Sequence, residues 1–455
     1  MNSNKRILFL VDHKFRDLQS LSLIGYLLGE KGYDVKFIAI WQENDIINEF
    51  NPSYIVLPKP GYAVDRLIKF KIDGRKTIVI NTEGNLQENK SVLNIPMPPD
   101  LYFFWNRTQF NVDKETLKKS KTKLVLAGCP RMDFLTGKLY KSIFPSKDQL
   151  LEKYKLPVTN KTITIATASQ DAHFSEALIQ QKEKIQKQKY RDAPNYRDVV
   201  NNMRYLRDKT SKIINGIVEN FPNINIVLKP HPNENIVYWQ ELVSSLNANN
   251  IFVSIGEPIY HLLKVSDLHI SHNVCTTTYE AMMTGVPTVE LHSKNSKKLW
   301  GSEHLYLADF IVESFDDLYE KVKKILVDNK FTRDSIKKDQ LNKYTEEYLY
   351  KVDGKRCLEY ANKIDSFIAN SNMTKNEINF FKKAQLLLKF SYLRCRKFIS
   401  QLKNRLFNYN NDKSSIIKNN KNINNRLDHL GRYDNRIVPG DEEFWFNKFK
   451  DINIS

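Results

Sequence analysis

Short apolar runs alternate with segments of helical periodicity along most of this 455-residue chain, and this alternation constrains the fold most strongly. The first series contains RILFLV, DVKFIAI, YIVLP and KTIVIN, separated by helical patterns such as AVDRLIKFKI, and closes with KLVLAGCPRMDFL. A second series contains TITIATAS, INIVLKPHP, IFVSI, DLHIS and PTVEL. Such alternation indicates βαβ units and parallel sheets covered by helices on both faces. We therefore predict an α/β fold with two doubly wound domains.

The length and the linker signals set the expected domain boundaries. A chain of 455 residues is long for a single hydrophobic core. The polar, proline-marked segment YKSIFPSKDQLLEKYKLPVTN is typical of a linker. We place an N-terminal domain over residues 1–150, a second domain over 151–370, and a basic amphipathic helical tail over 371–455. Residues 180–207 predict an inserted helical segment, which either lines a cleft or is simply solvated.

The charge of the chain is concentrated in the predicted tail. Lys and Arg number 70 against 52 Asp and Glu, a net charge of +18, and the residues from Ser371 onward hold 17 basic and 8 acidic side chains, hence +9. The stretch FFKKAQLLLKFSYLRCRKFISQLKNRLF has apolar residues at helical spacing among its cations. It predicts peripheral contact with an anionic membrane. The alternative is a helix packed on the protein's own domains. Nucleic-acid binding is disfavoured because the charge lies outside any base-reading motif.

The remaining composition indicates a reducing compartment and no membrane span. The four cysteines have neither pairing-like spacing nor a CxxC pattern. The apolar run near the N-terminus covers only residues 7–11, and no run approaches the roughly 18 apolar residues that cross a bilayer. We expect a cytoplasmic protein, peripheral at the inner face of the membrane. The chain shows no DxD motif near a strand end and no HExxH motif, so no metal site is expected.

The stretch NINIVLKPHPNEN places a histidine between two prolines directly after a predicted strand. Each proline restricts the backbone around His231, so this loop has little conformational freedom to lose when a ligand binds. Lys229 adds a positive charge at the same strand end. We interpret the loop as a binding surface; the alternative is a proline-punctuated turn with an exposed histidine.

The segment SDLHISHNVCTTTYEAMMTGVPTVEL predicts a strand, a polar loop and the start of a helix. A helix N-terminus offers unpaired N–H groups and partial positive charge, which suit a phosphate. Ser271, Thr276 and Thr277 are candidate hydroxyl donors, and Glu280 is a candidate acceptor for a ribose hydroxyl. An ordinary N-capped helix is the alternative.

These motifs carry a family resemblance. LKPHP followed by SHNVCTTTYEAMMTGVPTV resembles the second domain of GT-B glycosyltransferases of capsule and lipopolysaccharide assembly that use CMP-activated sugars. The start, KRILFLVDHKFRDLQSLSLIGYLLGEKGYDVKFI, is similar to surface carbohydrate biosynthesis proteins related to bacterial β-Kdo transferases. The resemblance covers about residues 5–370 and implies two Rossmann-like domains with a cleft between them. It also implies that the His-Pro and Ser/Thr motifs hold the nucleotide.

Two carboxylates are the expected acid–base groups, because retaining β-Kdo transferases, which the chain resembles, use one carboxylate as nucleophile and another as acid or base. By position at strand ends we assign Asp171 to the first role and Glu83 to the second, with His231 also catalytic. The alternative for Asp171 is to cap a helix that begins near Phe174. Asp12 and Arg16, after the first strand, are expected to contact the acceptor.

The sequence thus predicts a metal-independent glycosyltransferase of surface polysaccharide synthesis. The expected co-substrate is a nucleotide-sugar, with a CMP-activated acidic sugar as best guess, and no resident cofactor is expected. The expected acceptor is a glycan or lipid-linked glycan. The alternatives are a transferase that uses CDP-glycerol or a UDP-sugar, and a nucleotide-sugar epimerase of the same shape.

Overall fold

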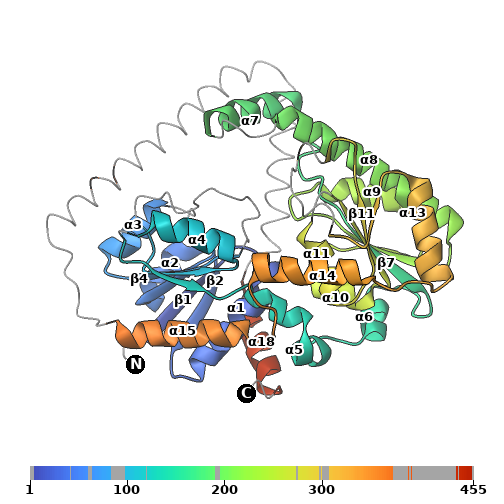
Figure 1. Cartoon of the computed structure of the whole chain (residues 1–455). Helices are drawn as coiled ribbons and strands as arrows, with labels where there is room; N and C mark the ends of the chain where they lie inside the picture. Colours follow the sequence, from blue (N-terminus) through green and yellow to red (C-terminus); the bar gives the residue numbers. More distant parts are fainter. Residues whose placement is uncertain are drawn as a thin grey trace. The chain divides into compact units, whose positions relative to one another are not determined.

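The chain forms two compact units, each built on one sheet (Figure 1). Unit 1 comprises Met1–Lys138 and Tyr344–Ser455, and unit 2 comprises Leu139–Lys343. The structure is a computed structural model, and it describes residues 5–40, 42–59, 64–82, 98–118, 120–189, 195–272, 275–296, 299, 307–371, 388, 391, 437–438 and 440–452. Each unit has a six-stranded parallel sheet with helices on its faces, so the predicted fold of two doubly wound α/β domains is confirmed.

The sheet of unit 1 has the strand order β2-β1-β3-β4-β5-β6. Its strands are short, largely buried apolar runs, as expected for a parallel sheet covered on both faces. They are β1 (Arg6–Val11), β2 (Asp34–Ala39), β3 (Tyr54–Leu57), β4 (Lys76–Ile80), β5 (Leu101–Phe104) and β6 (Lys123–Leu126). The order reverses between β1 and β3, which is the point where ligands bind in open sheets of this type.

Helices cover both faces of this sheet. One face packs in a common core with α2 (Glu43–Phe50), α3 (Val64–Ile72) and α4 (Arg107–Thr116). Four further helical elements of unit 1 pack with one another: α1 (Lys14–Gly29), the 3-10 helix η2 (Pro130–Leu135), α15 (Arg356–Asn370) and α18 (Asp441–Lys450). The short π-helical turn η5 (Thr345–Leu349) packs against α4 instead.

Helix α15 is fixed to unit 1 by polar contacts at its first turn. The Asp133 carboxylate accepts the backbone N–H groups of Arg356, at 3.0 Å, and Cys357, at 2.7 Å. Tyr360 donates to the carbonyl of Gly128 at 2.7 Å. The sequence-based division placed residues 344–370 with the second domain, whereas these contacts hold α15 against the segment that follows β6.

Helix α18 shows that part of the predicted tail is a packed element of unit 1. Lys14 pairs with Asp441 at 2.7 Å, and the backbone N–H of Phe37 donates to Glu442. The rings of Trp445, Phe446 and Phe449 contact aromatic residues of unit 1, namely Phe134, Tyr26 and Phe37. The predicted amphipathic helix over 380–407 lies outside the described residues, apart from positions 388 and 391.

The sheet of unit 2 has the order β12-β11-β10-β7-β8-β9, with the reversal between β7 and β10. Its strands are β7 (Lys161–Ala166), β8 (Ile224–Lys229), β9 (Ile251–Val253), β10 (Leu268–His272), β11 (Thr288–Leu291) and β12 (Phe310–Val312). Its helices are α6 (Lys147–Lys153), α7 (Glu176–Lys189), α8 (Tyr196–Asn220), α9 (Ile236–Ser245), α10 (Ile259–Val265), α11 (Thr276–Met283), α13 (Phe315–Val322) and α14 (Ser335–Tyr344), with α5 (Gly137–Ser142) at the start of the unit and the π-helical turn η4 (Lys323–Val327) after α13.

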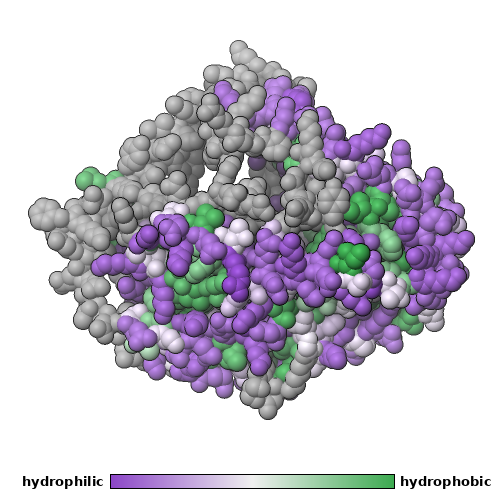
Figure 2. Space-filling model, viewed as in Figure 1, coloured by the Kyte–Doolittle hydropathy of each residue, from purple (hydrophilic) through white to green (hydrophobic). Residues whose placement is uncertain are grey.

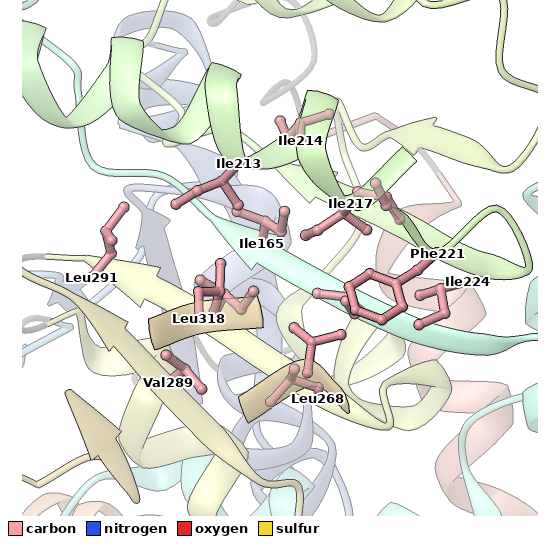
Figure 3. Close-up of a cluster of buried hydrophobic side chains, with 14 of the residues drawn as sticks. Ile165, Ile213, Ile214, Ile217, Phe221, Ile224, Leu268, Val289, Leu291 and Leu318 are labelled. Atoms are coloured by element: carbon pink, nitrogen blue, oxygen red, sulfur yellow. The ribbon is translucent and has the colours of Figure 1, made fainter. Parts of the chain in front are cut away.

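The two faces of this second sheet differ in chemistry. On one face Ile213, Ile214 and Ile217 of α8 pack beside Ile165 of β7 (Figure 3), in a core that also includes α9 and α13. Several side chains that alternate with those apolar residues along the strands are polar and buried: Thr162, Thr164, Asn225, His269, Ser271, Thr288 and Glu290. Because buried polar groups need hydrogen-bond partners, the helices over the polar face must supply them.

The surface is mostly hydrophilic over the described residues on the face shown in Figure 2. Within the described part of the chain, the structure contains no helix that is both long and apolar enough to span a bilayer.

Candidate functional site

The carboxyl edge of the unit 2 sheet collects most of the predicted site residues. Loops leave this edge after β7, β8, β10 and β11, on both sides of the β7–β10 reversal. The predicted Asp171 and His231 lie in the first two of these loops, and Ser271 lies near the end of β10. In open α/β sheets this edge, at the reversal, is where ligands bind.

A buried carboxylate that the sequence analysis did not single out organises two of these loops. Glu234 accepts hydrogen bonds from Thr167 Oγ1 at 2.7 Å, and from the backbone N–H and Oγ of Ser169, both at 2.8 Å. It also accepts from the backbone N–H of His231 at 3.2 Å and from Nε1 of Trp239 at 2.8 Å. The signal for this role was present in HPNEN, because an acidic residue just after a strand end is well placed to bind nearby backbone donors.

The loop after β7 is held from its other side by α8. Tyr196 donates to the Asp171 carboxylate at 2.7 Å, and Arg204 donates to the carbonyls of Ala172 and Phe174. Helix α7 begins at Glu176, and the N–H of Leu178 points to Ser175 Oγ at 3.4 Å. Ser175 thus takes the capping position of α7, and Asp171 instead accepts a hydrogen bond from Tyr196 of α8.

Helix α11 is anchored to the strands beneath it by buried hydroxyl groups. His269 Nε2 lies 3.0 Å from Thr277 Oγ1, and Ser271 Oγ lies 2.5 Å from Thr278 Oγ1. Thr278 in turn donates to Glu290 at 3.1 Å. The hydroxyls of Ser271 and Thr277, which we predicted as ligand donors, are therefore committed to holding the helix, while Thr276 is exposed. A ligand at this end would meet the first backbone N–H groups of α11.

Charged groups lie near the start of α11. Burial lowers the pKa of His269 to about 3, and the positive charge of Lys229 acts in the same direction. Burial raises the pKa of the Cys275 thiol; Lys229 opposes this rise and Glu280 reinforces it. Lys229 and Glu280 thus both act electrostatically on the N-terminus of α11. A cation beside a helix N-terminus suits an anionic ligand.

A further histidine in this edge is buried and neutral. His272 is fully buried at the end of β10. Burial lowers its pKa to about 4, and the negative charge of Glu234 opposes that effect. A neutral imidazole has one donor and one acceptor, so His272 contributes polarity without positive charge near neutral pH.

The predicted acceptor residues of unit 1 lie at the reversal of their own sheet. Arg16 donates to Asp12 at 3.1 Å, to Asp17 at 2.8 and 2.9 Å, and to Thr82 Oγ1 at 3.3 Å. Lys59 also approaches Asp12, at 3.7 Å. Glu83, the predicted acid–base carboxylate, follows Thr82 directly and lies outside the described residues.

Solved structures of other proteins share the fold of this chain. No protein-family model matches the sequence, and no curated protein is detectably similar to it. A solved variant of the wall teichoic acid polymerase TagF is similar, with a TM-score of 0.52 and 12% identity over 81% of this chain and 90% of that chain. The chain has a GT-B type fold. At this identity the similarity shows the fold alone.

Other solved GT-B structures are similar at lower scores. S. aureus MnaA in a co-structure with UDP has a TM-score of 0.48 and 13% identity, over 80% of this chain and 97% of that chain. UDP-GlcNAc 2-epimerase from Neisseria meningitidis, bound to UDP-GlcNAc, has a TM-score of 0.47 and 12% identity, over 79% of this chain and 100% of that chain.

Proposed function

We propose that this protein is a GT-B glycosyltransferase of surface polysaccharide synthesis. The observation that carries the proposal is the carboxyl edge of the unit 2 sheet. There the N-terminus of α11 follows β10 at the β7–β10 reversal, and Lys229 and the His231 loop follow β8, the next strand beyond β7. A nucleotide-sugar donor presents a phosphate and a ribose to such an edge. We propose that Glu280 of α11, whose side chain is buried, accepts from a ribose hydroxyl.

The same groups supply the chemistry that glycosyl transfer needs. Cleavage of the sugar–phosphate bond leaves a phosphate whose negative charge grows in the transition state, so preorganised positive groups lower the barrier. We propose that Lys229 and the α11 N-terminus supply that positive field, with His231 as a hydrogen-bonding group, in a metal-independent mechanism. Asp171 is proposed as the nucleophile and Glu83 as the acid–base residue.

The proposal extends to the donor and the acceptor. We propose a CMP-activated acidic sugar as the donor, with CDP-glycerol or a UDP-sugar as the alternative. One TagF structure was obtained after a soak with CDPG, and the epimerase from Neisseria meningitidis was bound to UDP-GlcNAc. We propose a glycan or lipid-linked glycan as acceptor, with Asp12 and Arg16 among its contacts, and peripheral attachment to an anionic membrane through the basic residues after 371.

An epimerase of the same fold is the second candidate, and the requirement for an acceptor separates the two. A transferase consumes acceptor and releases nucleotide in equal amounts. An epimerase converts the nucleotide-sugar without any acceptor. Donor consumption that is independent of acceptor would therefore favour the epimerase.

A nucleotide screen tests the proposal directly. Thermal unfolding is measured with CMP, CDP and UDP, since a ligand that binds only the folded state raises the melting temperature. One of them should stabilise the wild type, and His231→Ala should lose that shift while the ligand-free melting temperature stays unchanged. His261→Ala is the matched control, because His261 lies on α10 and bonds to Glu257 at 2.9 Å. Full stabilisation of His231→Ala by the same nucleotide would contradict the proposal.

Once a donor is found, turnover tests the proposed nucleophile. Asp171→Asn should lower turnover at least ~100-fold, the usual scale for losing an acid–base group. Tyr196→Phe removes the hydrogen bond to Asp171 but keeps the carboxylate, and it should have a smaller effect. An Asp171→Asn variant with wild-type turnover would restrict Asp171 to a structural role.

A further inference from the structure

We propose that Glu234 is a positioning residue that makes the loops after β7 and β8 a single unit and so holds His231 in its binding geometry. The inference rests on the proposed function for its consequence in nucleotide binding. Its structural part, the coupling of two loops by one carboxylate, stands on the contacts of Glu234 alone.

The distribution of donors over the two carboxylate oxygens is the first argument. Oε1 receives Thr167 Oγ1, the N–H of Ser169 and the N–H of His231. Oε2 receives Ser169 Oγ and Nε1 of Trp239. The donors come from the loop after β8, in which Glu234 itself lies, from helix α9 directly after it, and from the loop after β7, which is more than sixty residues away in sequence. One side chain thus joins two loops that are distant in sequence.

The burial of the carboxylate is the second argument. Glu234 is only 5% exposed. A buried carboxylate without hydrogen-bond donors is very costly, so both loops are held to the positions in which their donors reach Glu234. The backbone N–H of Glu234 also donates to the carbonyl of His231 at 2.8 Å. Glu234 therefore closes its own turn with its main chain and connects that turn to the loop after β7 with its side chain.

The chemistry of the donors explains why a carboxylate is needed here. Three of the five donors are N–H groups, which cannot turn round to accept a hydrogen bond. An amide in the place of the carboxylate would direct its NH₂ group either at Nε1 of Trp239 or at the N–H groups of Ser169 and His231. Glu234→Gln thus preserves size and shape but forces one donor against another.

Hydrogen exchange on the full-length protein tests the coupling without any assumption about substrate. In Glu234→Gln the amides of residues 167–174 and those of His231 and residues 233–236 should all exchange at least about 10-fold faster, since each loop loses a charge-assisted hydrogen bond. The amides inside β7 and β8 should keep their protection. The matched control is Glu257→Gln, which removes a carboxylate bonded to Lys153, Tyr154 and His261 and should leave both loops unchanged.

Three outcomes of the exchange experiment would overturn the inference: unchanged exchange in both loops, faster exchange in only one loop, and faster exchange throughout unit 2. The last would make Glu234 a general stability residue. Glu234→Asp provides a second variant, since it keeps the charge but shortens the reach, and it should loosen at least one of the loops.

Binding of CMP, CDP and UDP then tests the functional consequence. The affinity of Glu234→Gln for the nucleotide that stabilises the wild type should fall at least about 10-fold, while Glu257→Gln keeps it. Unchanged affinity alongside loosened loops would overturn the link to binding. If the wild type binds none of the three nucleotides, the proposed function fails, and the exchange data still decide whether Glu234 couples the loops.

Discussion

Gly128 occupies a crowded position in unit 1 that admits no side chain. Its φ is +83°, a conformation that residues with a Cβ rarely adopt. A Cβ atom here would lie 2.7 Å from the carbonyl oxygen of Leu349 and 3.0 Å from the Arg356 side chain. The glycine therefore allows the segment after β6 to lie directly against the chain that leads into α15.

We predict that Gly128→Ala destabilises the protein by about 2–4 kcal/mol, from left-handed backbone strain together with overpacking. Gly74→Ala is the matched control, because Gly74 has φ +75° but no atom within 4 Å of its would-be Cβ. The control should cost only about 1 kcal/mol, the strain alone. Urea unfolding of both variants measures the difference in the free energy of unfolding. Equal losses in the two variants would show that the chain around Leu349 moves aside at no cost, which contradicts the prediction.

Individual site residues were only partly predictable from the sequence. The place of His231 directly after a strand was predictable, because its prolines and the apolar run before it are local features. For Glu234, the local stretch HPNEN shows an acidic residue just after a strand end, but its partners Thr167 and Ser169 lie more than sixty residues away and only the fold identifies them. For Ser271 the sequence indicates a hydroxyl at a strand end, but only packing shows that this hydroxyl faces Thr278.

The interface of β10 with α11 makes unit 2 sensitive to acid. His269 is fully buried and bonded to Thr277, and burial lowers its pKa to about 3. In the unfolded chain a histidine has a pKa of about 6.5. Below that pH His269 is protonated in the unfolded state but stays neutral in the folded state. The free energy of unfolding therefore falls as the pH drops from about 6.5 toward 3.

We predict that the wild type loses about 2 kcal/mol through His269 between pH 7.5 and pH 5. His269→Gln keeps a polar side chain but cannot titrate, so its stability should depend less on pH by a similar amount. Urea unfolding at the two pH values gives both slopes. If the free energy of unfolding changes equally with pH in both proteins, His269 gains its proton as readily in the folded state as in the unfolded state, and the prediction is wrong.

At the level of elements, most strands were predicted from the sequence. RILFLV, TITIA and INIVL correspond closely to β1, β7 and β8, because each is a short run rich in apolar or β-branched residues. The predictions did not include β5 and β12, which have four and three residues. The place of α15 was also hidden, since it depends on its contact with Asp133 more than 220 residues earlier.

For the molecule as a whole, the packing of α18 decides which change to the C-terminal region can test the proposed membrane contact. Residues 372–436 contain 15 Lys/Arg and 4 Asp/Glu, a net +11, whereas residues 437–455 contain 2 and 4, a net −2. Truncation from residue 375 would therefore remove both the basic segment and a helix that covers aromatic residues of unit 1. Neutralising the basic segment alone separates the two effects.

We predict that a variant with glutamine at eight basic positions no longer binds anionic liposomes, while the wild type binds them and is released by high salt. Each cation near such a surface contributes roughly 1 kcal/mol before screening. The positions are Lys382, Lys383, Lys389, Arg394, Arg396, Lys397, Lys403 and Arg405. Liposome co-sedimentation measures binding. If the wild type does not bind anionic liposomes at low salt, the proposed membrane contact is wrong.

Truncation at residue 436 is the complementary control. It keeps every one of those eight cations and removes α18, so liposome binding should persist while unit 1 loses stability. Loss of binding in this truncated form, without loss of the fold, would instead place the membrane contact in the last nineteen residues.

Because α15 and α18 belong to unit 1, the first unit to begin synthesis is the last that can be finished. Unit 2 is one continuous stretch and can close its core once the ribosome has released residue 343. The first 138 residues of unit 1 cannot complete their packing until α15 and α18 are synthesised, more than 200 residues later. Until then the aromatic side chains beneath α18 stay uncovered, so the nascent chain depends most on chaperones over that interval.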